Sequence, residues 1–234
     1  MPIPSYSGET CVAFLDISGF KKMMERGIRA EETLNKFYNT IFVIGSEFNP
    51  SPSVRAANTG HVRSLVVSDC AVIFVDNIQL GKNKMRDLES VLRFVKRVNQ
   101  ALITPNPSPP IMTTCSIDYG RFKYQDRIEF RGIGKAYFFG QPYVNVFLDN
   151  EKLKNKPGYC RILRNRLRTP DNLRRNHPFS LLQREENYNY FYWMLDSLDH
   201  LPQFKRRYED ISQSVYPQMI SLLQRAAQKS NARA

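Results

Sequence analysis

Apolar residues in this chain follow two periods, which separate the segments expected to be strands from those expected to be helices. Compact runs rich in β-branched and aromatic side chains predict strands, and apolar positions that recur every three to four residues predict helices. The predicted strands are residues 10–17, 62–67, 71–75, 112–119, 122–124, 128–131, 158–165 and 187–195. The predicted helices are residues 21–26, 31–48, 83–103, a segment that starts near Tyr143, and residues 203–228.

Glycine and proline set the expected breaks between these elements. Gly120 predicts a bulge or bend in its strand, and residues 132–136 predict a loop. Pro142 suits the first turn of the next helix, and Asn145 falls at the N-terminal end of that helix. The residues expected on the inner face of this helix are Val144, Phe147 and Leu148.

The order of the elements predicts the fold class. It reads β, α, α, β, β, α, β, β, α, β, followed by a tail, which indicates an α+β sandwich with one mostly antiparallel sheet. The chain has 234 residues and no shift in composition that forces a division, so we expect one large domain.

The net charge of +12 is concentrated toward the C-terminal end. Residues 1–150 carry 18 basic and 14 acidic side chains, a net +4, whereas residues 151–234 carry 16 and 8, a net +8. This charge is compatible with nucleic acid, with an anionic small molecule such as a nucleoside triphosphate, or with solubility alone. No RNA-recognition signature accompanies the arginines near Tyr159, so nucleic acid is not the favoured partner. These arginines are Arg161, Arg164, Arg166 and Arg168.

Cysteine and histidine usage argues against a disulfide framework, a zinc site and a histidine-based catalytic dyad. All of these residues are far apart in the sequence: Cys11, Cys70, Cys115, Cys160, His61, His177 and His200. No apolar stretch is long enough to span a bilayer, and Pro2 and Pro4 interrupt any apolar segment of a signal peptide. We therefore expect a cytoplasmic protein with no membrane partner.

The stretch from Val12 to Phe20 carries the first candidate chemistry. It is a predicted buried strand that delivers Asp16 to a turn, where Gly19 lets the backbone approach a phosphate at a helix start. An aspartate in such a place also commonly caps a helix. Asp69 lies at the tip of the predicted hairpin, where a carboxylate either supports the turn or lies beside Asp16. Two such carboxylates would suit a pair of Mg²⁺ or Mn²⁺ ions in phosphoryl transfer.

Four segments resemble motifs of the class III nucleotide cyclases, in the right order, over roughly residues 10–155. Phe14–Phe20 is similar to the F-x-D-I-x-G-F signature, and Ser68–Phe74 is similar to the second metal hairpin, which normally has Gly-Asp followed by apolar residues. Ser116–Gly120 is similar to the G-I-x-x-G strand, and Gly140–Asn145 is similar to the segment that ends in Val-Asn. The resemblance implies a class III cyclase-like (ferredoxin-like) sandwich. Residues 1–156 would form the catalytic domain, and residues 157–234 a C-terminal extension of strands and a basic helix.

The resemblance also implies roles for individual residues. Asp16 and Asp69 would bind two Mn²⁺ or Mg²⁺ ions, with the Ile17 carbonyl as a further ligand. The amides of Ser18, Gly19 and Phe20 would hold the triphosphate. Asn145 would orient the ribose from the opposite protomer, because active sites in this family form at the interface of a head-to-tail homodimer.

Two departures from the family pattern bear on activity and substrate. The family's transition-state arginine lies four residues after the asparagine, where this chain has Asp149. The substitute cation is open among Arg63, Arg121, Arg131 and Lys135. The two positions that usually read a purine with polar side chains fall on Leu65 and near Phe138, so ATP and GTP are both disfavoured. With Phe14 and Arg63, these two complete the candidate substrate-binding set.

A short cyclase domain with these replacements is similar to the bacterial Pycsar pyrimidine cyclases, whose product activates a separate effector protein in antiphage defence. The resemblance implies a uridylate cyclase that converts UTP to cyclic UMP and pyrophosphate. A cytidylate cyclase acting on CTP stays open, as does a cyclase-like module that binds nucleotides without turnover. A basic RNA-binding protein is the third alternative.

Overall fold

One sheet runs through the computed structural model, which describes residues 5–27, 29–49, 61–76, 83–105, 108–129, 133–153, 155–164, 167, 176–185, 187–211 and 215–231. The strands are β1 (Tyr6–Ile17), β2 (His61–Val67), β3 (Cys70–Asp76), β4 (Thr113–Glu129), β5 (Ile133–Phe139), β6 (Cys160–Leu163), β7 (Leu182–Arg184) and β8 (Tyr188–Phe191). The helices are α1 (Phe20–Glu25), α2 (Ala30–Phe48), α3 (Lys84–Ile103), α4 (Gln141–Glu151), α5 (Leu201–Asp210) and α6 (Tyr216–Asn231), with short 3₁₀ turns η3 (Phe179–Leu181) and η4 (Leu198–His200).

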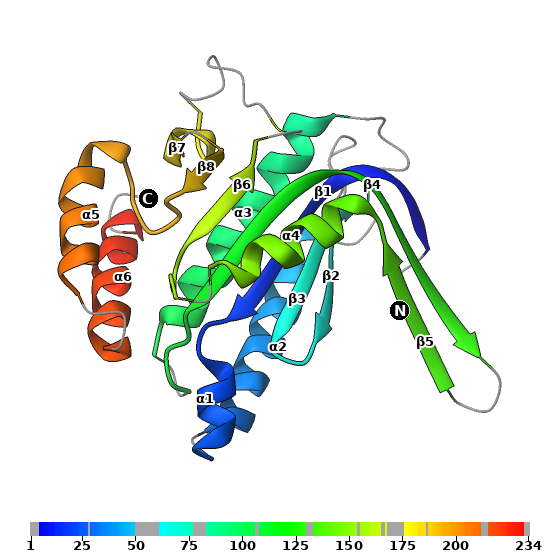
Figure 1. Cartoon of the computed structure of the whole chain (residues 1–234), viewed down its shortest axis with the longest axis horizontal. Helices are drawn as coiled ribbons and strands as arrows, with labels where there is room; N and C mark the ends of the chain where they lie inside the picture. Colours follow the sequence, from blue (N-terminus) through cyan, green and yellow to red (C-terminus); the bar gives the residue numbers. More distant parts are fainter. Residues whose placement is uncertain are drawn as a thin grey trace.

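The strand order is β2-β3-β1-β4-β6-β8-β7, and β5 pairs with β4 outside this path as a hairpin arm (Figure 1). Among the described strands every pair is antiparallel except β4 with β6. The predicted α+β fold with a mostly antiparallel sheet is confirmed. No helix among the described residues is sufficiently long and apolar to cross a bilayer.

Alternation along the strands gives the sheet two apolar faces. On β1, Leu15 and its alternate neighbours join the large core beneath α2 and α3, whereas Phe14 points to a smaller cluster beneath α4. Figure 1 shows α4 on one side of the sheet and α2 and α3 on the other. Asp16 follows Phe14 by two positions, so β1 presents Asp16 on the α4 side.

The C-terminal segment joins the same sheet through β6, which pairs with β4. The Gly158 amide donates to the Thr113 carbonyl at 2.8 Å, and the Trp193 indole donates to the Gly158 carbonyl at 2.8 Å. The large core contains Trp193 and the apolar sides of α5 and α6. Residues beyond 156 therefore share one core with the strands before them.

The bulge predicted at Gly120 was wrong. Gly120 pairs with Thr10 in a register that runs without a break from Ile17 opposite Thr113 to Tyr6 opposite Tyr124. An extra residue here would turn Phe122 and Tyr124 to the other face of the sheet, away from the cluster that buries them.

The predicted boundaries of the β4–β5 hairpin were also wrong. Ile128 belongs to β4, the returning strand begins at Ile133, and Arg131 lies outside the described residues. The pairing runs from Lys123 opposite Phe139 to Glu129 opposite Ile133. Backbone hydrogen bonds, which apolar patterning does not report, extend both strands beyond the apolar runs.

The single terminal helix predicted at 203–228 is two helices, α5 and α6. Pro217 lies in the first turn of α6, where the missing amide hydrogen has no cost. A proline at that place marks a helix start, and the continuous apolar period across it concealed the break.

The inner face predicted for α4 was wrong for Val144 and Leu148, whereas the Phe147 ring contacts Phe14 on the sheet. Val144, Phe147 and Leu148 are 43%, 41% and 56% exposed, whereas the same helix buries Val146 and Asp149. A buried ion pair holds Asp149 inward, and this turns the more apolar stripe of the helix outward.

Candidate functional site

The end of β1 and the β2–β3 turn bring Asp16 and Asp69 together. Asp16 pairs with Cys70, the residue after Asp69, and the Ile17 amide donates to the Asp69 carbonyl at 2.9 Å. Burial, followed by the negative charges of Asp16 and Asp69, raises the pKa of the Cys70 thiol to about 11. The charges of both carboxylates thus act on the same thiol, and both aspartates are only partly exposed.

The turn itself has a strained residue. Ser68 adopts a left-handed conformation with φ of 54°, at the position where the resemblance led us to expect glycine. A non-glycine residue in this region costs about 1 kcal/mol. The backbone thus keeps a glycine-like geometry immediately before Asp69.

The turn after β1 offers fewer amides than the sequence suggested. The Ser18 amide donates to the Met112 carbonyl at 2.9 Å, so this amide is already used inside the sheet. Gly19 has φ of 78° and precedes Phe20, the first residue of α1. Amides in the first turn of a helix have no acceptor within that helix, which leaves those of Gly19 and Phe20 for an anion.

An apolar cluster lies on the same sheet face. Phe14, Leu65 and Phe138 come from three strands and pack on one cluster beneath α4. The Phe138 ring meets the Tyr143 ring edge-on at 4.5 Å, and the Phe14 ring meets the Phe147 ring at 5.5 Å. Leu65 and Phe138, the two positions expected near the base, thus pack against the same cluster as Phe14, another residue of the candidate substrate-binding set.

The candidate cations are placed differently. Arg63 shares the sheet face of Leu65, two positions away, but its guanidinium pairs with Asp76 at 3.4 Å. Arg121 is exposed and falls on the opposite face, because it alternates with Phe122. Arg131 and the side chain of Lys135 lie outside the described residues.

Asn145 is held by two neighbours. Its amide nitrogen donates to Asp118 Oδ2 at 2.7 Å, and the Gln141 amide donates to Asn145 Oδ1 at 2.8 Å. Asp118 is 1% exposed and lies on β4, so a buried carboxylate fixes the orientation of the asparagine amide. Sequence reasoning missed Asp118, although a carboxylate inside a predicted buried strand signals that it has a partner.

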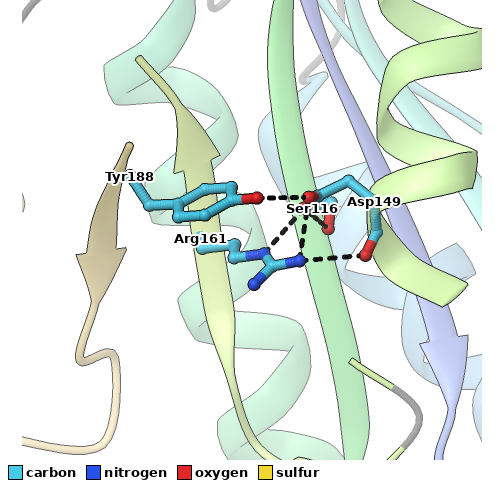
Figure 2. A network of polar contacts seen from close by, with 4 residues as sticks. All are labelled: Ser116, Asp149, Arg161 and Tyr188. Atoms are coloured by element: carbon cyan, nitrogen blue, oxygen red, sulfur yellow. Dashed lines mark hydrogen bonds and ion pairs between the residues drawn. The ribbon is translucent and has the colours of Figure 1, made fainter. Parts of the chain in front are cut away.

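Asp149 is the centre of a buried network beneath the C-terminal half of α4 (Figure 2). Arg161 Nε donates to Asp149 Oδ2 at 2.7 Å and Nη2 donates to Oδ1 at 2.8 Å. The Ser116 hydroxyl donates to Oδ2 at 2.7 Å, and the Tyr188 hydroxyl donates to Oδ1 at 3.2 Å. Burial acts to lower the pKa of Arg161, but its hydrogen bonds with Asp149 and the aspartate's charge outweigh this and raise that pKa.

The sequence matches no protein-family profile and none of the curated proteins compared with it. Solved structures do match. The guanylate cyclase domain of RhGC from Catenaria anguillulae, in complex with GTP, is 14% identical with a TM-score of 0.50, over 69% of this chain and 81% of that one. The catalytic core of a rhodopsin-guanylyl cyclase with converted specificity, in complex with ATPαS, is 13% identical with a TM-score of 0.53, over 80% and 95%.

A double mutant of the guanylyl cyclase domain of the RhoGC fusion protein from Blastocladiella emersonii gives the same TM-score, 0.53, at 13% identity over 80% of this chain and 94% of that one. The chain has the fold of class III cyclase catalytic domains. At these identities the comparison shows the fold alone, so chemistry in this cyclase-like domain rests on its own residues.

The donor set in this cyclase-like domain fits a hard divalent cation. Asp16, Asp69 and the Ile17 carbonyl are oxygen donors gathered at one strand end, as Mg²⁺ and Mn²⁺ prefer. No group of three or more His, Cys, Asp or Glu side chains that could hold a metal exists within the described ranges. Phosphate oxygens of a substrate and water would therefore have to complete the coordination.

Proposed function

We propose that the chain is a homodimeric uridylate cyclase, which converts UTP to 3′,5′-cyclic UMP and pyrophosphate. The observation that carries this proposal is the convergence of Asp16 and Asp69 on Cys70 at the end of β1. The cyclase-like fold and a turn with two amides for an anion support it. The cyclic nucleotide would act on a separate effector protein as a second messenger in antiphage defence.

Each residue then has a chemical task. Asp16, Asp69 and the Ile17 carbonyl would hold two Mn²⁺ or Mg²⁺ ions. When bound, such ions would supply charge that lowers the pKa of the ribose 3′-hydroxyl and neutralises pyrophosphate. The amides of Gly19 and Phe20 bind the triphosphate. The ribose 3′-oxygen attacks the α-phosphorus, the bond to the β-phosphate oxygen breaks, and the hydroxyl proton passes to water. Asn145 of the opposite protomer orients the ribose, and Asp118 holds that asparagine.

The apolar side chains at the expected base positions support a pyrimidine substrate. Phe14, Leu65 and Phe138 present no side-chain hydrogen-bonding group to read a purine. A site without polar side chains that hydrogen-bond to the base cannot select adenine or guanine through such bonds. A cytidylate cyclase acting on CTP is the nearest alternative, because both pyrimidines fit the same apolar surface.

The outward face of α4 supports the homodimer. Val144, Phe147 and Leu148 are all more than 40% exposed on one helix. Together they form an exposed apolar patch, which is typical of a protein interface. A second copy covering this face would also lie beside Asn145, as the proposed shared site requires.

A binding module without turnover is the second candidate, and one observation favours it. Asp149, at the position of the family arginine, is committed to Arg161 within the core. Neither side chain of this pair is available to stabilise charge on a substrate. The cation would have to come from Arg63 or from another candidate.

Four radiolabelled triphosphates incubated separately with the purified protein and Mn²⁺ test the proposal. We expect cyclic UMP from UTP, and we expect Asp16→Asn and Asp69→Asn to abolish it while the circular dichroism spectrum is unchanged. Glu89→Gln, on exposed α3 surface, is the matched control and should retain full activity. Product from CTP alone would reassign the base, tight UTP binding without product would favour the binding module, and turnover by either aspartate variant would remove the metal assignment.

A further inference from the structure

A cavity of about 340 Å³ lies between α5 and α6, outside the candidate cyclase site. Leu195, Asp196 and His200 of the turn η4 also line it. Figure 1 shows α5 and α6 packed together at the edge of the molecule, away from α4 and the β2–β3 hairpin. Nothing in the proposed cyclase reaction uses this cavity.

Three cations face the cavity from two helices. Arg207 comes from the last turn of α5, and Arg225 and Lys229 come from α6. In the part of the chain that the structure describes, none of these three forms an ion pair or a side-chain hydrogen bond. Among the described residues they are therefore cations without an ion-pair partner.

These three exposed side chains concentrate positive charge at the rim of the cavity. Arg225 and Lys229 are four residues apart, so they lie on one face of α6 and repel each other. The sequence of α6 contains no Asp or Glu that could offset them. Asp196 is the one acidic residue in the lining, and its charge also acts on Lys96. An anion between the helices would relieve the repulsion.

The rest of the lining suits an organic group that is bonded to the anionic group of the ligand. Leu195, Phe204 and Leu222 are less than 9% exposed and form an apolar floor, and the side chains of Gln203 and Gln228 add amide donors and acceptors. Guanidinium groups match phosphate oxygens in a two-pronged geometry. The volume is in the range of small-ligand sites, which begins at about 300 Å³.

We propose that this cavity binds a nucleoside phosphate, with the phosphate between Arg207, Arg225 and Lys229 and the base on the floor at Phe204. It is a second nucleotide site, built from the C-terminal helices. The proposal stands independently of the cyclase activity, because it uses no residue of that site. A half-open cavity of this volume between two helices fits one nucleotide, whereas RNA binding would need an extended basic surface.

Binding of 5′-UMP and 5′-AMP to the full chain in the presence of EDTA tests this proposal by titration calorimetry. Arg207→Glu and Arg225→Glu should each weaken binding by about tenfold or more, because each removes a charge-assisted hydrogen bond. Arg206→Glu, the neighbouring exposed residue of α5 that does not line the cavity, is the matched control and should leave affinity unchanged. Phe204→Leu keeps the floor apolar and should weaken both nucleotides but not inorganic phosphate.

The outcomes separate the proposal from its rivals. Saturable binding that depends on Arg207 and Arg225 but not on Arg206 supports it, whether or not the chain turns over UTP. Absence of nucleotide binding at millimolar concentration overturns the proposal. Binding that Arg206→Glu, Arg207→Glu and Arg225→Glu all leave intact overturns it as well. Tighter retention of an RNA oligonucleotide, lost equally in Arg206→Glu, would replace the cavity with a diffuse basic surface.

Discussion

Arg161 and Asp149 form a two-pronged ion pair whose side chains are 7% and 4% exposed. The two contacts measure 2.7 Å and 2.8 Å, and the Arg161 guanidinium also lies 4.2 Å from the centre of the Tyr188 ring. The pair joins α4 to β6. It gives Asp149 a structural role at the position where the sequence resemblance led us to expect a transition-state arginine.

Asp149→Ala should lower the free energy of unfolding by about 3–5 kcal/mol, because it leaves the Arg161 charge buried without a partner. Urea unfolding followed by circular dichroism measures this. The control is Glu89→Ala, which breaks the exposed pair with Arg93 and should cost less than about 1 kcal/mol. Equal losses in the two variants would contradict a structural role for the buried pair.

Asp149→Arg should not restore a catalytic cation. The new guanidinium would face Arg161 in a buried site, so we expect a loss of stability larger than that of Asp149→Ala and no gain in cyclic product. The thermal unfolding midpoint and the yield of cyclic UMP from UTP are the two measurements. Increased turnover in this variant would show that the side chain at 149 reaches the substrate.

Gly140→Ala should strongly destabilise the junction of β5 and α4. Gly140 has φ of 149°, and an added Cβ would overlap the backbone carbonyl oxygen of Arg121. We expect a loss of about 2 kcal/mol or more. Gly45→Ala within α2 is the control, since its Cβ would meet only Ser64 Oγ at 3.9 Å, and it should stabilise by about 0.5–1 kcal/mol. Similar effects of the two substitutions would refute the steric argument.

His177 should make the fold sensitive to mild acid. Its partial burial, followed by the charges of Lys96 and Arg93, lowers its pKa below the ordinary 6.5, and Lys96 Nζ lies 3.0 Å from His177 Nε2. The unfolded chain takes up a proton as the pH falls through 6.5 while the folded chain does not, so stability declines below that value. The neutral imidazole accepts a hydrogen bond from Lys96, and protonation would end this bond.

His177→Gln keeps an acceptor for Lys96 but does not titrate. Between about pH 7.5 and about pH 5 this variant should lose less stability than the wild type in urea unfolding. His200→Gln, at an exposed histidine, should follow the wild-type curve. Parallel curves for all three proteins would assign the acid sensitivity to other groups.

Leu148→Glu should convert the proposed dimer into a monomer, since it places a charge in the exposed apolar patch of α4. Sedimentation velocity measures the change, and cyclic UMP formation should fall with it because the proposed site needs both protomers. Phe42→Glu, at a residue that is 76% exposed on α2, is the control and should leave the oligomeric state unchanged. A dimer that survives Leu148→Glu would move the interface away from α4.

The sequence by itself determined the elements that carry Asp16 and Asp69. The apolar run before Asp16 is continuous and β-branched, and the two runs beside Asp69 are separated by a short turn, so both strand ends follow from local patterning. Helices α2 and α3 are long and periodic for the same reason. The α+β class then follows from their order.

Tertiary structure alone decided what Asp149 does. Its partners Ser116, Arg161 and Tyr188 come from three strands, 33, 12 and 39 residues away, and no local pattern links them. The ion pair holds Asp149 inward, so Val144 and Leu148, which apolar spacing predicted to be inward, are exposed. The cationic cavity depends likewise on the packing of α5 against α6, because only that packing brings Arg207 to face Arg225. Local periodicity determines which element forms, whereas the long-range partners of buried polar groups determine which face of it the protein presents.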